Sequence, residues 1–246
     1  MSDAENIITY IDDVLVHSAN HTLHIQHLSS ALSRIRAAHL RLNAKKCIFA
    51  ATSVQYLGHT LSASGVRPGS CKIKAIRDCL PPTSQKQLKA FLGLANYFRN
   101  YIKGFSSLAA PLFALTRKSS GWPLIGPSLP QAALSAFHAI KSAISSQPVL
   151  AYPSPLGDLT LAVDSAQGDA NNQGGMGAAL LQQQPDGSNK PIGYASRQLL
   201  TYERNYPAFL LEMAAAVFGM DYFHHYLVGR PFRLLLSTEI AQHQEL

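Results

Sequence analysis

The stretch Ile-Ile-Thr-Tyr-Ile-Asp-Asp-Val-Leu-Val occupies residues 7–16 and places two adjacent carboxylates, Asp12 and Asp13, between two short apolar runs. This pattern predicts a β-hairpin with the acids at its tip. Neighbouring side chains on a strand point to opposite faces, whereas a tight turn brings both carboxylates near one ion. Mg²⁺ prefers such oxygen ligands, so the tip is a candidate metal site. An Asp pair alone is a weak signal, because Asp favours turns, and the apolar flanks strengthen it.

The composition narrows the class of protein. A chain of 246 residues that is 47% hydrophobic is long enough for one large domain or two modest ones. It has no run of eighteen apolar residues, so we expect no membrane span. The first fifteen residues contain no Lys or Arg, which argues against a secretory signal. Three cysteines without a CxxC pair favour a reducing, intracellular compartment over a disulfide framework.

Charge is distributed unevenly along the chain. The net charge is +7, but residues 31–120 alone hold fifteen Lys and Arg and a single acid, Asp78. A basic block of this kind is typical of proteins that lie along a phosphate backbone. A solvated basic face explains the composition equally well, so the motifs must decide.

Residues 22–120 predict short strands and two helices. A helix is expected from Thr22, as its N-cap, to His39, followed by strands at 47–49 and 54–57 and a hairpin punctuated by Gly58 and Gly65. A second helix is capped by Thr83 or Ser84 and has an apolar stripe from Leu88 to Ile102. The cations of this second helix are then free to face outward, namely Lys86, Lys89, Arg99 and Lys103.

The rest of the chain predicts a mixed layer of strands and helices. Residues 121–130 read as a linker and 132–144 as an amphipathic helix. Strands follow at 159–163, which ends in Asp164, and at 176–182 and 191–196. A long apolar helix at 209–227 precedes a last strand at 232–237. Three meandering strands, a helix and another strand indicate an α/β layer.

A second acidic site is suggested by Asp164 and Glu212. Glu212 lies within the apolar sequence Leu-Leu-Glu-Met-Ala, and an unpaired buried carboxylate is costly. A metal ion shared with Asp164 would explain it, and so would a buried pairing with an Arg.

Several motifs in order resemble the reverse transcriptases of gypsy-like LTR retrotransposons. Residues 10–18 resemble their polymerase metal turn, residues 24–28 the helix that follows it and residues 42–47 the next palm motif. Residues 56–59 resemble the primer-grip hairpin, residues 91–99 the thumb helix and residues 148–152 the segment before the ribonuclease H domain. A second group resembles their ribonuclease H domain, at residues 164–166, 175–180, 194–197 and 203–206.

The resemblance implies an α/β (α+β) chain in four parts. These are a partial polymerase palm at 1–80, a helical thumb at 81–120, a connection at 121–155 and a truncated ribonuclease H-like mixed sheet with helices at 156–246. It implies an RNA-directed DNA polymerase and ribonuclease H from a retroelement, located in the cytoplasm, a retroelement particle or the nucleus.

The resemblance also implies roles for the palm and thumb residues. Asp12 would be the main metal ligand and Asp13 its weaker companion. Lys46, or Lys45, would lie near the phosphates of the incoming dNTP in the intact enzyme. Tyr56, Leu57 and Gly58 would hold the primer end. The basic thumb would follow the backbone of a template–primer duplex.

In the ribonuclease H region, Asp164 and Glu212 take the places of the first two catalytic acids. They would hold Mg²⁺ or Mn²⁺ so that water attacks the RNA strand of an RNA–DNA hybrid. The third acid of the family is an Asp after a Thr, whereas here Thr238 is followed by Glu239. The longer side chain displaces its carboxylate, and residues 167–173 resemble an insertion. We therefore expect weak or absent hydrolysis.

The polymerase site of the family also needs a third, upstream aspartate. Only nine residues precede Tyr10, and Asp3 and Glu5 lie too close to the turn to replace it. We therefore expect that the isolated chain does not polymerise. Three alternatives stay open, namely an enzyme fragment, a non-catalytic nucleic-acid-binding relic and an unrelated metal hydrolase.

Two further clusters of side chains are discounted as sites. His21, His24 and His27 recur every three residues, but a zinc site needs further ligands in tetrahedral geometry and none is evident. Aromatic residues at 222–226 are better explained by packing against the sheet than by base stacking.

Overall fold

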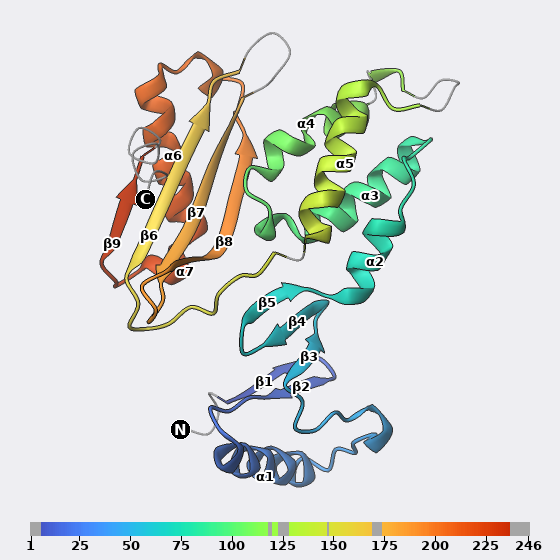
Figure 1. Cartoon of the computed structure of the whole chain (residues 1–246), viewed down its shortest axis with the longest axis vertical. Helices are drawn as coiled ribbons and strands as arrows, with labels where there is room; N and C mark the ends of the chain where they lie inside the picture. Colours follow the sequence, from blue (N-terminus) through green and yellow to red (C-terminus); the bar gives the residue numbers. More distant parts are fainter. Residues whose placement is uncertain (1–5, 118–119, 123–127, 147, 169–173, 237–246) are drawn as a thin grey trace. The chain divides into compact units, whose positions relative to one another are not determined.

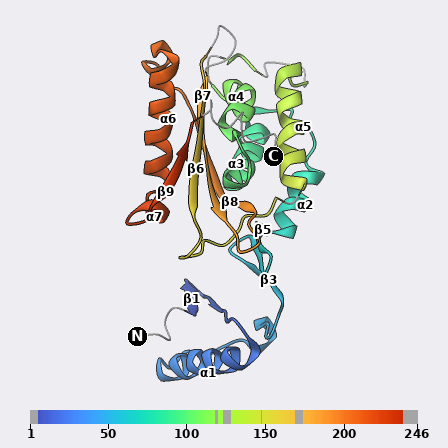
Figure 2. The same cartoon turned by 60° about the vertical axis from the view of Figure 1, so that its left-hand side comes forward.

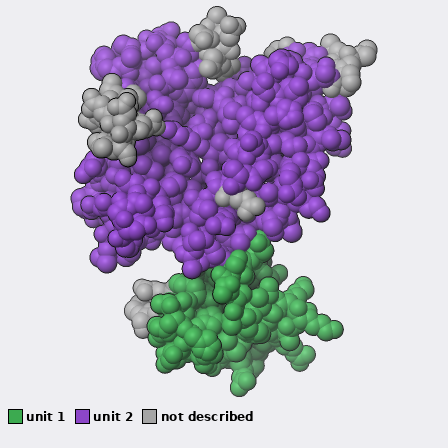
Figure 3. All heavy atoms as spheres, viewed as in Figure 1, with its two compact units in different colours: residues 1–56 green, residues 57–246 purple. Residues whose placement is uncertain are grey.

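The computed structural model describes residues 6–117, 120–122, 128–146, 148–168 and 174–236. The chain divides into two compact units, residues 1–56 and 57–246, which are coloured separately in Figure 3. Glu239, one of the expected ligands, lies outside the described residues, as do Asp3, Glu5 and residues 169–173.

Unit 1 begins with the expected hairpin. Strands β1 (Ile7–Tyr10) and β2 (Asp13–Val16) pair antiparallel, with Tyr10 opposite Asp13. Helix α1 (His21–Ala37) follows, and its cap is Asn20 rather than Thr22, because the Asn20 side chain accepts a hydrogen bond from Leu23 N at 2.9 Å.

The strand expected at residues 47–49 is absent. The Asn43 side chain accepts a hydrogen bond from Lys45 N at 3.1 Å and caps a short 3₁₀ helix, η2 (Ala44–Lys46). Such a local side-chain bond competes with strand pairing, so the apolar run after it stays irregular. Strand β3 (Ser53–Tyr56) ends the unit close to the expected position.

Unit 2 starts with the hairpin of β4 (His59–Ser62) and β5 (Gly65–Pro68), which pair antiparallel. Its helical part contains α2 (Ser70–Asp78), α3 (Gln85–Tyr97), the 3₁₀ helix η3 (Arg99–Tyr101), α4 (Phe105–Leu115) and α5 (Gln131–Ser145). Ser84 caps α3 by accepting a hydrogen bond from Gln87 N, as expected from the sequence.

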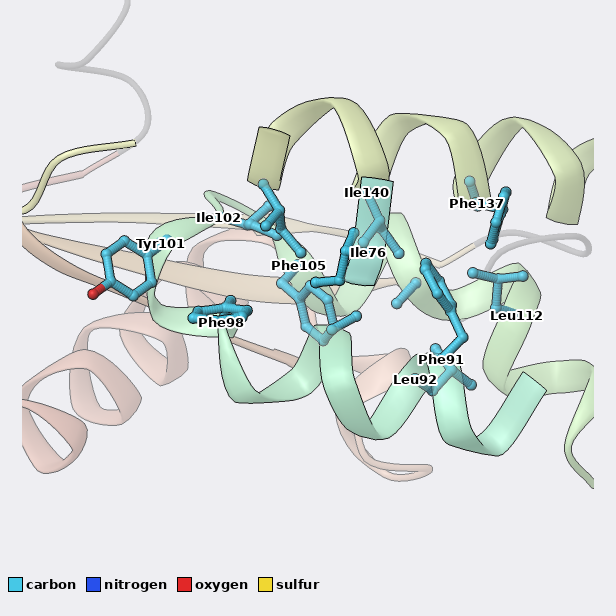
Figure 4. Packing of buried hydrophobic residues seen from close by; sticks show 14 of the residues in the cluster. Ile76, Phe91, Leu92, Phe98, Tyr101, Ile102, Phe105, Leu112, Phe137 and Ile140 are labelled. Atoms are coloured by element: carbon cyan, nitrogen blue, oxygen red, sulfur yellow. The ribbon is translucent and has the colours of Figure 1, made fainter. Parts of the chain in front are cut away.

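These helices share one core. Figure 4 shows the side chains that fill it, and Phe91 of α3 meets Phe137 of α5 with ring centroids 4.6 Å apart. Helices α2 and α4 are not expected from the sequence. Only Ile73 and Ile76 of α2 are buried, and α4 contains Pro111, which removes a helical hydrogen bond and hides the pattern.

The second part of unit 2 is a four-stranded sheet in the order β8-β7-β6-β9. The strands are β6 (Leu159–Ala166), β7 (Gly175–Gln183), β8 (Asn189–Gln198) and β9 (Phe232–Leu235), of which β6 and β9 run parallel and the others antiparallel. Helix α6 (Ala208–Tyr222) packs on one face, and α4 contacts β8 on the other side (Figures 1 and 2).

A hydrophobic core lies between α6 and the sheet. Leu161, Val163 and Leu180 of the sheet pack with Leu211 and Ala215 of the helix. The long helix expected at 209–227 is two helices. Helix α6 ends at Tyr222, and Phe223 is both its C-cap and the N-cap of α7 (His224–Leu227). None of the helices in the described ranges combines the length and apolar character that crossing a membrane requires.

Candidate nucleic-acid interface and acidic sites

The hairpin tip presents both palm carboxylates to solvent. Asp12 lies in the two-residue turn and Asp13 begins β2, and both are exposed. Neither forms a salt bridge with any residue that the structure describes. The preceding Ile11 has a φ of 51°, a left-handed conformation that costs an L-residue about 1–2 kcal/mol. Strain of this kind concentrates at functional sites.

The other palm positions lie on short local elements. Lys45 and Lys46 are both exposed on η2. Tyr56 ends β3 and is partly buried. Leu57 and Gly58 form a tight turn before β4 with φ values of 47° and 75°. The Tyr97 hydroxyl at the end of α3 donates to the Leu57 carbonyl and so fixes this turn to the helices of unit 2.

Three of the four expected thumb cations are exposed. Lys86 and Lys89 lie on α3, on the side away from its buried residues, and Lys103 follows η3. Arg99 does not face outward as expected. It is partly buried and its guanidinium donates to the Ser196 carbonyl on β8.

The Arg99 contact is part of a junction between the helices and the sheet. Ser106 N donates to Ser196 Oγ at 2.9 Å, and the Tyr222 hydroxyl donates to Asn100 Oδ1 at 2.7 Å. The sequence did not predict which way the Arg99 side chain points. Helix α3 ends at Tyr97, so the helical spacing of its apolar residues does not extend to residue 99.

Asp164 lies within β6 rather than at its end, since the strand continues to Ala166. Its neighbour Val163 packs in the core beneath α6, so Asp164 points to the opposite face of the sheet. There it lines an open cavity of about 550 Å³ together with Lys103 and Arg233. Asp164 is exposed, and it forms no salt bridge within the described ranges.

Glu212 lies on α6 next to the buried Leu211 and is only partly buried. The described residues contain no group of three acidic, His or Cys side chains arranged for a metal ion. On α1, His24 and His27 each contact Ser18 Oγ through Nδ1, at 3.4 and 2.8 Å.

A bidentate pairing of an Arg with a buried acid occurs at Glu203. Arg197 on β8 contacts the Glu203 carboxylate with two nitrogens at 2.6 and 2.7 Å, and Leu200 N donates to it at 2.7 Å. The hydrogen bond from Arg197 lowers the pKa of Glu203, although burial opposes the shift. The same bond raises the pKa of Arg197. Two polar residues six positions apart give no pattern from which this pair could be inferred.

Two protein-family models match the chain. A model described as an RNase H-like domain found in reverse transcriptase matches residues 130–234. A model described as reverse transcriptase (RNA-dependent DNA polymerase) matches residues 2–61.

Curated relatives match over most of the chain. The retrovirus-related Pol polyprotein from transposon opus of Drosophila melanogaster is 34% identical over 89% of this chain. That from transposon 297 of the same fly is 31% identical over 93%, and the transposon Tf2-3 polyprotein of Schizosaccharomyces pombe is 30% identical over 94%. The chain spans only 22%, 20% and 17% of the length of these three polyproteins.

Solved structures with the same fold include the foamy viral protease-reverse transcriptase. The match to its complex with dsDNA covers 98% of this chain and 49% of the viral chain, with a TM-score of 0.78 and 19% identity. The match to its complex with an RNA/DNA hybrid covers 95% of this chain and 31% of the viral chain, with a TM-score of 0.76 and 20% identity.

Proposed function

Because this chain is a relative of LTR-retrotransposon Pol polyproteins, with reverse transcriptase and RNase H-like regions, we propose that it binds nucleic-acid duplexes as part of a retroelement reverse transcriptase. Unit 2 would hold a template–primer duplex or an RNA–DNA hybrid. The foamy viral relatives in the solved structures carry dsDNA and an RNA/DNA hybrid. The free cysteines Cys47, Cys71 and Cys79 suit a reducing compartment, such as the cytoplasm, a retroelement particle or the nucleus.

The observation that carries this proposal is the cationic side of α3. Lys86 and Lys89 are exposed, while Leu88, Phe91 and Leu92 on the same helix are buried in the core. Lysine ammonium groups that neutralise phosphates release condensed counterions, which supplies affinity without reading sequence. The described part of residues 31–120 contains one acid, Asp78, which pairs with Arg77 and leaves the lysines unopposed.

The binding proposal is tested by measuring the affinity for a labelled RNA–DNA hybrid over a range of salt concentrations. The Lys86→Ala/Lys89→Ala variant should bind more weakly and lower the slope of log K against log salt by about two. A Lys190→Ala/Arg204→Ala variant is the control, because it removes the same charge at two exposed positions outside α3, one on β8 and one on the 3₁₀ helix η5 (Glu203–Asn205). Equal effects of the two variants, or no binding by the unaltered chain, would refute the proposal.

The acids supply a further, metal-dependent part of the proposal. Carboxylate oxygens are the donors that Mg²⁺ and Mn²⁺ prefer, and exposed Asp164 and partly buried Glu212 fit that requirement in kind. Bound metal would supply an activated water and neutralise charge on the scissile phosphate. In the polymerase half-site, Asp12 and Asp13 would hold a metal ion that activates the primer 3′-oxygen and neutralises charge on the leaving pyrophosphate. Lys45 or Lys46 would lie near the phosphates of a dNTP.

Release of labelled RNA fragments from the hybrid in Mg²⁺, abolished by Asp164→Asn, would establish hydrolysis by the chain. A second candidate function is duplex binding without turnover. It is favoured by Glu239, which follows Thr238 where the family has an Asp, because the longer side chain displaces the third carboxylate. Salt-dependent binding with no fragments at any Mg²⁺ or Mn²⁺ concentration would identify this second function.

A further inference from the structure

A lysine that the sequence motifs do not single out lies directly at the turn of Leu57 and Gly58. Lys72 Nζ on α2 is 3.3 Å from the centroid of the Tyr97 ring and 5.9 Å from that of Phe98. A Cβ atom built on Gly58 would lie only 2.6 Å from this ammonium. The lysine head therefore rests between an aromatic face and the bare Cα of the turn.

The charge of Lys72 is not neutralised by an acid in the described residues. Its side chain takes part in none of the salt bridges found there. The contact with the face of the Tyr97 ring stabilises the ammonium electrostatically. An ammonium has three N–H donors, and a ring face engages only one side of it. Lys72 is only half-buried, and its remaining donors suit an anionic oxygen that reaches the ammonium from solvent.

The turn beside Lys72 is held from two directions. Gly69 N donates to the Gly58 carbonyl at 2.9 Å, which fixes the turn to the start of α2, three residues before Lys72. The Tyr97 hydroxyl donates to the Leu57 carbonyl from the end of α3. The lysine and the turn therefore form one local unit rather than two independently moving parts.

His59 anchors the Tyr97 hydroxyl in turn. Its Nε2 lies 3.2 Å from that hydroxyl and its Nδ1 lies 2.8 Å from the Tyr101 hydroxyl. Burial, and then the charge of Lys72, lower the pKa of His59, so the ring is neutral near pH 7 and has one donor and one acceptor.

The hydrogen positions around His59 follow from this neutral ring. The Tyr97 proton goes to the Leu57 carbonyl, so Nε2–H donates to the Tyr97 oxygen and Nδ1 accepts from Tyr101. The result is a continuous donor chain from buried Tyr101 to the turn, in which every polar atom has a partner.

We propose that Lys72 binds a backbone phosphate of the primer strand at the turn of Leu57 and Gly58, and that His59 and Tyr97 are positioning residues for this site. The inference rests on the proposed function, in which unit 2 holds a template–primer duplex. Lysine binds phosphate as a point charge, so its placement decides which phosphate it contacts. That placement is fixed here by the Tyr97 ring and the Gly58 backbone.

The experiment compares Lys72→Ala with Lys74→Ala in the whole chain. Lys74 is exposed on the same helix, and both variants remove one positive charge. The probe is a fluorescent DNA primer annealed to a longer RNA template. Lys72→Ala should weaken binding about tenfold and lower the salt slope by about one, as expected for the loss of a charged hydrogen bond to phosphate.

Lys74→Ala should change the affinity less than about threefold, since it removes only long-range attraction. Equal loss in the two variants, or an unchanged affinity for Lys72→Ala, overturns the assignment while leaving duplex binding by unit 2 intact. No salt-dependent binding by the unaltered chain overturns the proposed function, and the assignment with it.

The positioning role is tested with Tyr97→Phe, which keeps the ring under Lys72 and removes the hydroxyl. A 2-aminopurine at the primer 3′ end reports the placement of the terminal base. Tyr97→Phe should bind the duplex with a similar affinity and salt slope but with altered fluorescence of the bound primer end. Tyr222→Phe, which loses a hydroxyl bond to Asn100, is the control. Identical fluorescence of the Tyr97→Phe and unaltered complexes would exclude the positioning role.

Discussion

Replacement of Glu203 by alanine removes the acid that ties the end of β8 to the turn before α6. The Glu203 side chain is 5% exposed and that of Arg197 31% exposed. Breaking a buried ion pair by removing one partner costs about 3–5 kcal/mol. Water reaches part of the Arg197 guanidinium and will offset some of this loss, whereas Leu200 N also loses its acceptor. We therefore expect a loss near the lower limit, about 3 kcal/mol.

Urea and thermal unfolding followed by circular dichroism measure this loss. A change of about 3 kcal/mol corresponds to a fall in Tm of about 6–12 °C for a unit of this size. Asp221→Ala, at an exposed acid on α6, is the control and should change the free energy of unfolding by less than about 0.5 kcal/mol. A loss below about 1 kcal/mol in Glu203→Ala would refute the reasoning, because the pair would then contribute no more than an exposed one.

The pKa of Glu203 is lowered in the folded protein, so the stability that its carboxylate contributes is present above the unfolded pKa, roughly pH 4, and is lost as the pH falls through the folded pKa. Glu203→Gln should therefore make the free energy of unfolding, measured with urea, depend less on pH in this acidic range. Gly219→Ala should lower the free energy of unfolding by about 1–3 kcal/mol, because its Cβ would lie 3.0 Å from the Ala178 Cβ. In Gly93→Ala the new Cβ meets no atom within 4 Å, so this variant should stabilise α3 by about 0.5–1 kcal/mol. Thermal unfolding measures both changes. Arg99→Ala removes the hydrogen bond to the Ser196 carbonyl, so it should lower the free energy of unfolding by about 1–2 kcal/mol and leave the salt slope of duplex binding unchanged. A slope lowered by about one would show instead that Arg99 contacts phosphate.

The elements that the sequence predicted well have strong local signals. The β1–β2 hairpin follows from two apolar runs around Asp12 and Asp13, and α3 from its cap at Ser84 and its apolar stripe. The false strand at 47–49 arose because apolar residues were read without the Asn43 cap that redirects the backbone. Local bonds of this kind override hydrophobic pattern over stretches of a few residues.

The candidate sites were predictable in residue type but less so in placement. The charge of carboxylates and lysines indicates binding of metal ions and phosphates, and most of the predicted site residues of these types are exposed. Placement depends on contacts between segments far apart in sequence, such as Arg99 with Ser196 and Lys72 with Tyr97. No spacing rule within one helix or strand encodes such pairs, because the chain path between the segments determines them.

Lysine reactivity in the presence and absence of an RNA–DNA hybrid tests duplex binding by unit 2 most directly. Acetylation of exposed lysines, quantified by mass spectrometry, reports which ammonium groups the duplex covers. The account predicts protection of Lys86, Lys89 and Lys103, with Lys190 on β8 unchanged. Equal reactivity with and without hybrid at low salt, or protection that is as strong at Lys190 as on α3, would contradict it.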